Sequence, residues 1–261
     1  MNAKLRALVG EYMPSGMKIW LMKRASRDDG FEALHHDEHL RVTRLADDAD
    51  SDAHTVFVCF TGIKQGLGGL GAEEFVGSTR REGHTALFVS DLQRSWYNGF
   101  PPEHLQTILR PYVEGRRVIT LGNSMGGFGA IWAAQWLGAE RAIAFAPQFS
   151  VHPDIVPGET RWTEWRNRIS EWRVPSLLDS FADGTDYFVF HGDADSEHYH
   201  QFPERPNILN VVIADSGHGP AAKLKEAGVL GEVFAQCLSG KDPRPTIREA
   251  GLTLKPISSD K

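Results

Sequence analysis

Short apolar segments alternate with longer amphipathic segments along most of the chain. In Thr55-Val56-Phe57-Val58-Cys59-Phe60, hydrophobic residues follow one another without the polar alternation of a half-exposed strand. Continuous hydrophobicity of this length is typical of parallel strands that helices cover on both faces. The pattern predicts central strands at residues 55–60, 85–89, 118–121, 142–145, 187–190 and 209–213.

The amphipathic segments carry apolar residues three and four positions apart, which places those residues on one face of a helix. This spacing predicts helices at residues 71–82, 103–114, 125–138 and 220–238. A strand–helix alternation of this kind indicates βαβ units and parallel strand pairing. We therefore predict a single α/β domain over residues 1–261, with a mostly parallel central sheet and helices on both faces.

The remaining segments interrupt this alternation. Residues 18–22 and 40–45 are apolar enough to add strands at the start of the sheet. Residues 152–183 contain three tryptophans among charged residues, and we expect them to form a small cap over the site. The proline-containing tail, residues 241–261, is expected to be loosely attached.

Composition excludes several classes of protein. The 28 basic and 34 acidic residues give a net charge of −6, which does not favour binding to nucleic acid. Two cysteines, Cys59 and Cys237, are too few for a disulfide scaffold or a four-cysteine zinc site. No apolar run reaches the length of a secretory signal or of a membrane span. We expect a cytoplasmic protein with no membrane partner.

A Gly-x-Ser-x-Gly motif lies between a predicted strand and a predicted helix. It reads Gly122-Asn123-Ser124-Met125-Gly126 and is followed by Gly127. A strand–turn–helix context is what this motif needs to expose a nucleophilic serine above the edge of a sheet. The glycines allow strand and helix to approach closely, and the helix N-terminus brings N–H groups to a developing oxyanion. We predict Ser124 as a nucleophile.

A serine nucleophile needs a general base and an acid that orients the base. Two predicted strands downstream end in polar segments, which contain Asp193 and Asp195 in one and His218 in the other. The carboxyl ends of parallel strands meet at the edge of the sheet where ligands bind. His218 is the expected base, while either aspartate could be the acid.

At these motifs the sequence resembles the α/β-hydrolase superfamily. The likeness covers roughly residues 53–238 and is carried by Gly-Asn-Ser-Met-Gly-Gly, His-Gly-Asp-Ala-Asp and Ser-Gly-His. The resemblance implies a triad of Ser124, Asp195 and His218 that needs no metal or cofactor, with Asp193 as the rival acid. It implies a serine hydrolase acting on a carboxylester, with an acyltransferase on the same triad as the alternative.

The resemblance also implies an oxyanion hole made of two backbone N–H groups. One belongs to Met125, the residue after the nucleophile. The other comes from the loop after strand 55–60, where Phe60-Thr61-Gly62-Ile63 occupies the place of the family's frequent His-Gly. The alignment assigns this second donor to Ile63, although Gly62 remains an alternative.

The next loop contains a competing motif. Residues 66–71 match Gly-x-Gly-x-x-Gly, and Asp91 follows twenty residues later, as in a dinucleotide-binding fingerprint. In that fold the first glycine directly follows the strand, whereas here residues 62–65 intervene. A flexible oxyanion loop is the favoured interpretation, and a dinucleotide-dependent oxidoreductase is the less favoured alternative.

Two histidine-containing clusters are candidate metal sites. In His35-His36-Asp37-Glu38-His39 adjacent side chains cannot all face one ion, so a solvated turn is favoured. A second cluster comprises His191, Asp193, Asp195, Glu197, His198 and His200, and would suit a metal-assisted hydrolase. That interpretation leaves the Ser124 motif without a purpose, so we predict no metal.

Aromatic residues suggest the class of substrate. Trp96 and Tyr97 follow a strand end, and Trp162, Trp165 and Trp172 lie in the expected cap. Amphipathic rings at a pocket rim can lie against a sugar or a flat ester. A cap of this size is too small for a deep acyl tunnel. We therefore expect a small-molecule or carbohydrate ester with a short acyl group, bound by Gly62, Trp96, Tyr97 and Trp162.

Overall fold

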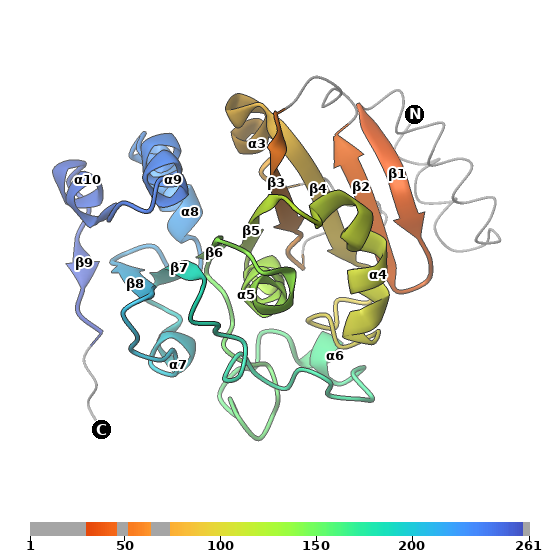
Figure 1. The fold of residues 1–261 in the computed structure, drawn as a ribbon. Coiled ribbons are helices and arrows are strands. Elements are labelled where there is room, and N and C mark those ends of the chain that lie inside the picture. Colours follow the sequence, from red (N-terminus) through yellow and green to blue (C-terminus); the bar gives the residue numbers. More distant parts are fainter. Residues whose placement is uncertain (1–29, 46–51, 64–73, 258–261) are drawn as a thin grey trace, which may run out of the picture.

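The computed structural model describes residues 30–45, 52–63 and 74–257, which form one twisted nine-stranded sheet with helices on both faces (Figure 1). The strand order is β1-β2-β4-β3-β5-β6-β7-β8-β9. The strands are β1 (Phe31–His36), β2 (Leu40–Leu45), β3 (Asp52–Phe60), β4 (His84–Asp91), β5 (Arg117–Asn123), β6 (Arg141–Phe145), β7 (Asp186–Gly192), β8 (Ile208–Ile213) and β9 (Leu254–Lys255).

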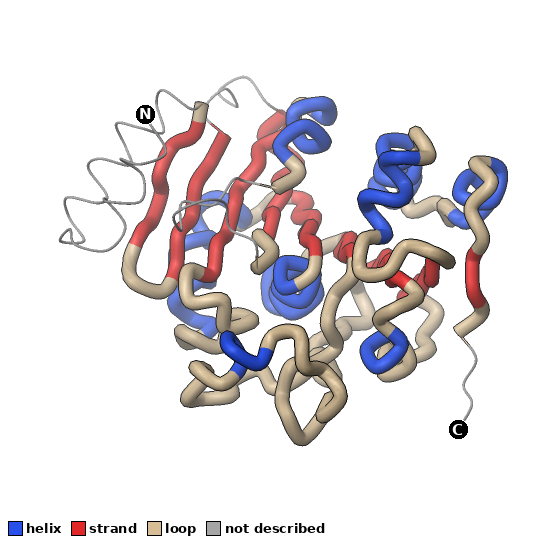
Figure 2. Tube along the Cα trace, turned by 180° about the vertical axis from the view of Figure 1, so that it is seen from behind, coloured by secondary structure: helices blue, strands red, loops and turns tan. Residues whose placement is uncertain are grey.

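The centre of the sheet is parallel and its two edges are antiparallel. Parallel pairing runs from β4 through β3, β5, β6 and β7 to β8. The β1–β2 hairpin adds to β4 at one edge, and β9 adds to β8 at the other; Figure 2 shows these strands at the two sides of the sheet. Both additions are antiparallel. The prediction of a mostly parallel sheet is confirmed, and so is the extra strand at residues 40–45. The strand expected at residues 18–22 lies outside the described residues.

Alternate residues of the central strands face two separate hydrophobic cores. Val56, Val58 and Phe60 of β3 face the core that contains buried residues of α4 and α5. Phe57 and Cys59 face the opposite core, where α8, α9 and α10 pack. The helices are α3 (Val76–Glu82), α4 (Pro102–Val113), α5 (Met125–Leu137), α6 (Thr163–Arg166), α7 (Ser196–Tyr199), α8 (Pro220–Glu226), α9 (Leu230–Leu238) and α10 (Arg244–Glu249).

The predicted helix at 220–238 is divided in two. α8 ends at Glu226 and α9 begins at Leu230, and Gly228 between them has a φ of 77°. A positive φ ends a right-handed helix, and glycine adopts it without a steric penalty. The apolar periodicity was continuous because both helices pack on the same core.

Residues 152–183 follow β6 and contain a single short helix, α6. The rest of the segment consists of turns and bends that the structure ties to the body of the protein. Leu177 N–H donates to the Phe149 carbonyl, and the Asn98 side chain accepts from Val174 N–H and donates to its carbonyl. The segment is therefore fixed against the loop that follows β4.

The expectation of a loosely attached tail is wrong for residues 241–257. These residues form α10, whose Ile247 is fully buried, and β9, which pairs with β8. Lys255 also donates from Nζ to Asp193. The prolines that suggested a loose tail lie where they fit the structure, since Pro245 occupies the first turn of α10 and cannot interrupt its hydrogen bonds.

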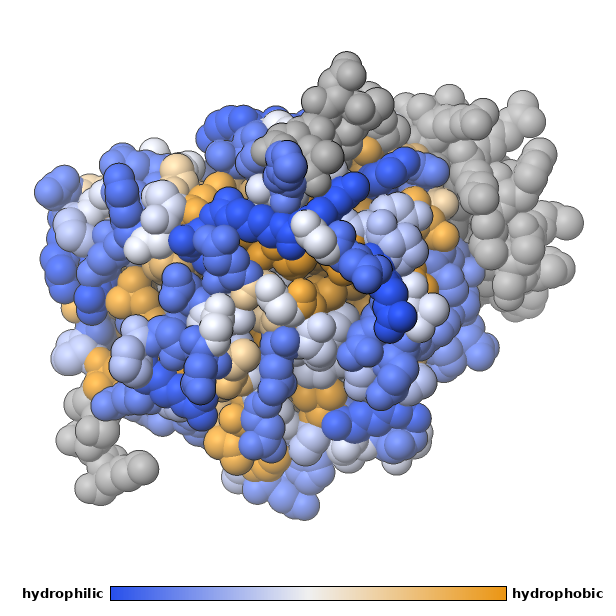
Figure 3. All heavy atoms as spheres, in the orientation of Figure 1, coloured by the Kyte–Doolittle hydropathy of each residue, from blue (hydrophilic) through white to orange (hydrophobic). Residues whose placement is uncertain are grey.

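The described surface is mostly polar. Figure 3 shows hydrophilic residues over most of one face, with apolar residues between them. Among the large hydrophobic residues that the structure describes, only Leu178 is strongly exposed, at 60%. No helix within the described ranges combines the length and the apolar character needed to cross a bilayer.

The packing of α10 predicts a measurable contribution of the tail to stability. We expect Ile247→Ala to lower the free energy of unfolding by about 2–4 kcal/mol, because it leaves a cavity in a closed core. Leu178→Ala, which truncates an exposed side chain, should change it by less than about 0.5 kcal/mol. Urea unfolding of both variants measures the difference. If Ile247→Ala is as stable as the wild type, α10 does not stabilise the fold.

Candidate active site

Ser124 occupies a sharp turn between β5 and α5. Its φ is 57° and its ψ is −123°, a region that non-glycine residues rarely adopt. A Cβ on Gly122 would lie 2.0 Å from the Gly126 carbonyl oxygen, and one on Gly126 would lie 2.1 Å from the Phe60 oxygen. Only glycine fits at either position, and these close contacts allow β5, α5 and β3 to hold the strained serine in place.

Ser124 lies in a chain of hydrogen bonds with His218 and Asp195. Its Oγ is 3.0 Å from His218 Nε2, and His218 Nδ1 is 2.7 Å from Asp195 Oδ2. The three residues come from the carboxyl ends of β5, β7 and β8. The structure thus brings together the serine, histidine and aspartate that the sequence suggested.

Asp193 has different partners from Asp195. Its carboxylate accepts N–H groups of residues 215, 216 and 217, in the loop that leads to His218, and a bond from Lys255. The N–H bond from Asp215 and the bond from Lys255 hold the pKa of Asp193 well below its usual range. Asp193 therefore fixes the loop that carries the histidine, while Asp195 contacts the imidazole.

Gln148 completes the surroundings of the serine hydroxyl. It is fully buried after β6, and its Nε2 donates to Ser124 Oγ at 3.1 Å. The Trp96 indole, which can only donate, bonds to Gln148 Oε1 at 3.0 Å and so fixes the orientation of the amide. With one lone pair of Oγ occupied by Gln148, the hydroxyl hydrogen is free to point at His218.

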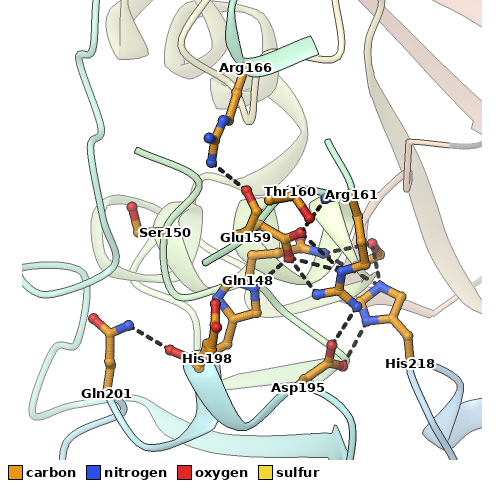
Figure 4. A network of polar contacts seen from close by, with 12 residues as sticks. Gln148, Ser150, Glu159, Thr160, Arg161, Arg166, Asp195, His198, Gln201 and His218 are labelled. Carbon is orange, nitrogen blue, oxygen red and sulfur yellow. Dashed lines mark hydrogen bonds and ion pairs between the residues drawn. The ribbon is translucent and has the colours of Figure 1, made fainter. Parts of the chain in front are cut away.

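Glu159 and Arg161 lie beside Asp195 in a network of polar contacts (Figure 4). Arg161 Nη1 donates to Asp195 Oδ1 at 2.8 Å, and the same guanidinium bonds to both oxygens of Glu159. Glu159 also bonds to His198 Nε2 at 3.0 Å. Glu159, Asp195 and His198 are each at most 3% exposed. The network thus joins residues 159–161 to the beginning of α7.

The network keeps both carboxylates ionised. Burial by itself would raise the pKa of Asp195, but the bonds and charges of His218 and Arg161 outweigh it and lower the pKa. Burial opposes ionisation of Glu159 in the same way, yet His198 and Arg161 lower its pKa to about 2. Both groups are therefore negatively charged at neutral pH.

The candidates for an oxyanion hole are backbone N–H groups of Met125 and of the loop after β3. Met125 is the first residue of α5, so its N–H has no partner within the helix. Gly62 donates its N–H to Glu74, a carboxylate whose burial raises its pKa to about 7. This bond occupies the Gly62 N–H and so favours Ile63 as the second candidate donor, and the Ile63 carbonyl accepts a 2.9 Å bond from Arg94 Nε.

Among the predicted substrate-binding aromatic residues, two lie in the core. Tyr97 is fully buried against Phe60 and Trp132, and donates its hydroxyl to the Thr61 carbonyl. Trp96 is also fully buried, and its N–H is used by Gln148. The prediction that they line the pocket rim is wrong, because the backbone turns at both residues with positive φ and directs them inward.

Trp162 does lie beside the site. Its ring is 6.2 Å from that of His218 and 6.3 Å from that of Trp96, between centroids. Its buried Nε1–H has no hydrogen-bond partner among the described residues. The other two tryptophans of residues 152–183 pack against other side chains. Arg94 stacks over the Trp165 ring, and His152 packs against Trp172.

The dinucleotide-type motif and the second histidine-containing cluster were the competing predictions. Residues 64–73, which contain the glycines of the dinucleotide-type motif, lie outside the described residues. Asp91 is fully buried and accepts bonds from residues 93, 95 and 97, so it organises the loop after β4. His191 bonds to Asn210 and His198 to Glu159, so the histidines of the second cluster do not converge with Asp193.

Sequence reasoning missed Gln148, Glu159 and Arg161. Gln148 follows the end of a predicted strand at the active edge, and this position was a usable signal. Glu159 and Arg161 lie in a segment without periodicity, and only the folded path of residues 152–183 brings them to Asp195.

No protein-family model matches this sequence, and no curated protein matches it. Solved structures do match. The capsule O-acetyltransferase of Neisseria meningitidis serogroup A is 15% identical with a TM-score of 0.53, covering 79% of this chain and 94% of that one. Est1E from Butyrivibrio proteoclasticus is 13% identical with a TM-score of 0.53, covering 80% and 99%.

The Glycosylation Associate Protein (Gap123) complex from Streptococcus agalactiae also matches, at 15% identity and a TM-score of 0.53. The match covers 80% of this chain but only 46% of that one. Identities this low show a shared fold. Together with the sheet order and the Ser124 turn, they show that the chain has the α/β-hydrolase fold.

Proposed function

We propose that this protein is a serine hydrolase that cleaves a carboxylester through an acyl-enzyme. The observation that carries the proposal is the hydrogen-bonded chain from Ser124 through His218 to Asp195, with distances of 3.0 and 2.7 Å. The Ser124 turn also supports the proposal. Close contacts at the neighbouring glycines keep the serine backbone in its strained conformation, and such strain is typical of functional sites.

In the proposed reaction, His218 Nε2 accepts the Ser124 proton while Oγ attacks the carbonyl carbon of the ester. The tetrahedral intermediate then collapses, its alcohol leaves with the proton from His218, and an acyl-serine remains. A water molecule attacks the acyl-serine with the same proton transfers and releases the acid. Asp195 holds the tautomer of His218 that presents Nε2 to the serine and stabilises the imidazolium.

Charge that develops on the carbonyl oxygen needs fixed donors. Met125 N–H and Ile63 N–H are the proposed pair, and the Arg94 bond to the Ile63 carbonyl would hold the second donor in place. Removing one such donor from a serine hydrolase costs about 10²–10³ in kcat.

Arg161 is proposed as a positioning residue for this triad. It contacts Asp195 through Oδ1, while His218 uses Oδ2, so the carboxylate is held at both oxygens. Glu159 in turn fixes the guanidinium through two bonds from Nε. This arrangement supports one orientation of Asp195, and therefore of the imidazole that it orients.

The proposed substrate is a small-molecule or carbohydrate ester with a short acyl group. The Trp162 ring lies beside His218, and its Nε1–H, which has no hydrogen-bond partner among the described residues, is a candidate donor to a substrate oxygen. A cavity of about 450 Å³ lies between the loop after β4 and residues 165–173, but neither Ser124 nor His218 lines it, so it does not define the substrate site.

Transfer of the acyl group to a sugar hydroxyl is a second candidate function. This candidate is favoured by the similarity to a capsule O-acetyltransferase, since the match covers 94% of that protein's chain. Both reactions share the acyl-enzyme and differ only in whether water or an alcohol attacks it.

Covalent labelling tests the nucleophile. We expect a fluorophosphonate to modify wild-type protein at Ser124, because the probe traps a serine that a histidine activates. Ser124→Ala should remain unlabelled, while Ser239→Ala, which changes an exposed serine at the end of α9, should label as the wild type does. Mass spectrometry of the digested protein locates the probe. A modified peptide elsewhere, or none, contradicts the proposal.

Unfolding at different pH tests the Arg161 network. Carboxylates with lowered pKa values stabilise the fold above their unfolded pKa, near 4, and lose this effect as pH falls towards the folded value, about 2 for Glu159. Arg161→Met should therefore cost about 1–3 kcal/mol at pH 7 and progressively less between pH 5 and pH 2. It should also lower kcat.

The matched control is Arg168→Met, because Arg168 forms an exposed ion pair with Glu164. It should change stability by less than about 0.5 kcal/mol at any pH. If the two variants behave alike, the Arg161 network does not hold Asp195.

A series of p-nitrophenyl esters from acetate to palmitate tests the substrate class. We expect kcat/KM to be highest for the shortest acyl groups and Ser124→Ala to be inactive throughout. Rates that rise beyond about eight carbons would require an apolar channel of a length that contradicts the short-acyl proposal. Adding a monosaccharide and analysing products by mass spectrometry separates the two reactions, since an acyltransferase yields the acylated sugar.

A further inference from the structure

Three side chains of types that bind metals converge beside β1 and β2, the edge strands on the side of the sheet away from Ser124. His35 Nε2 and His104 Nε2 each lie 2.8 Å from Asp37 Oδ2. His35 belongs to β1, Asp37 to the turn between β1 and β2, and His104 to the first turn of α4. One ligand atom from each residue lies within 4.8 Å of the other two.

The turn directs Asp37 towards the two histidines. Its Oδ1 accepts the N–H groups of His39 and Leu40, at 2.8 and 2.7 Å, which leaves Oδ2 facing the imidazoles. The carboxylate is thus oriented, as a metal ligand held by outer hydrogen bonds is.

The two imidazoles approach from different elements with their Nε2 atoms towards the same point. Their ring centroids are 5.1 Å apart and their planes are inclined by 78°. Ligand atoms of tetrahedral zinc lie about 3.3 Å from one another, which follows from bonds of about 2.0–2.2 Å. The side chains are 26–36% exposed, so small rotations can open the present distances to that spacing and leave one position for water.

We propose that His35, Asp37 and His104 form a binding site for a divalent transition-metal ion, with Zn²⁺ as the best match. Two imidazole nitrogens and one carboxylate oxygen are a ligand set that zinc accepts, whereas calcium and magnesium prefer oxygen ligands. The site is separate from the proposed ester chemistry, which needs no metal. A bound ion would join the β1–β2 hairpin to α4 and so stabilise this edge of the sheet.

Zinc titration of the whole protein tests the site. Protein treated with a chelator and then dialysed is titrated with ZnCl₂ against a chromophoric zinc indicator at pH 7.5. We expect one equivalent to bind and the midpoint of thermal unfolding to rise with it. His104→Ala and Asp37→Asn should each weaken binding at least about tenfold and remove the rise in the midpoint.

Two control variants test whether zinc binding is specific to His35, Asp37 and His104. His200→Ala, which removes an exposed histidine that is not among the three proposed ligands, should bind zinc as the wild type does. Ser124→Ala should also bind normally, which keeps the outcome independent of the proposed hydrolase activity. Absence of one-to-one binding, or equal affinity in His104→Ala, would show a hydrogen-bonded cluster that holds no metal.

Discussion

The close approach of β5, α5 and β3 around Ser124 is the constraint on which the rest of the site depends. A Cβ at Gly122 or Gly126 would come within 2.1 Å of a backbone oxygen, so neither position tolerates a side chain. The Ser124 N–H donates to the Phe145 carbonyl of β6 at 2.8 Å, which ties the turn to the next strand. These contacts hold a backbone conformation that costs about 1–3 kcal/mol by itself.

Placing the serine in this way fixes where its partners must lie. β7 and β8 follow β6 in the parallel sheet, so their carboxyl ends open on the same edge as the turn. Gly192 at the end of β7 has no room for a Cβ, which would lie 1.7 Å from the Gly217 carbonyl oxygen. The loops that carry Asp195 and His218 therefore pack directly on each other, and the 2.7 Å bond between the two side chains follows from that packing.

A feature can be predicted from the sequence when the residues that cause it are close together along the chain. Buried strands and the Gly122–Gly126 motif depend on neighbouring residues, so the sheet, its helices and the serine, histidine and aspartate were accessible to sequence reasoning. Trp96 and Tyr97 were misplaced because their burial depends on a loop that Asp91 organises through several backbone bonds. Arg161 and His104 meet partners 34 and 67 residues away, and no periodicity links such positions.

Asp193 and Asp195 show how environment rather than residue type decides a role. Both follow β7, and both were candidate acids for one histidine. Asp193 faces backbone N–H groups of the 215–217 loop and the ammonium of Lys255, so its charge is used to shape that loop. Asp195 is 2% exposed and faces an imidazole and a guanidinium, so its charge acts on side chains. Because β9 supplies Lys255, the C-terminal strand also contributes to the position of His218, although it lies at the far edge of the sheet.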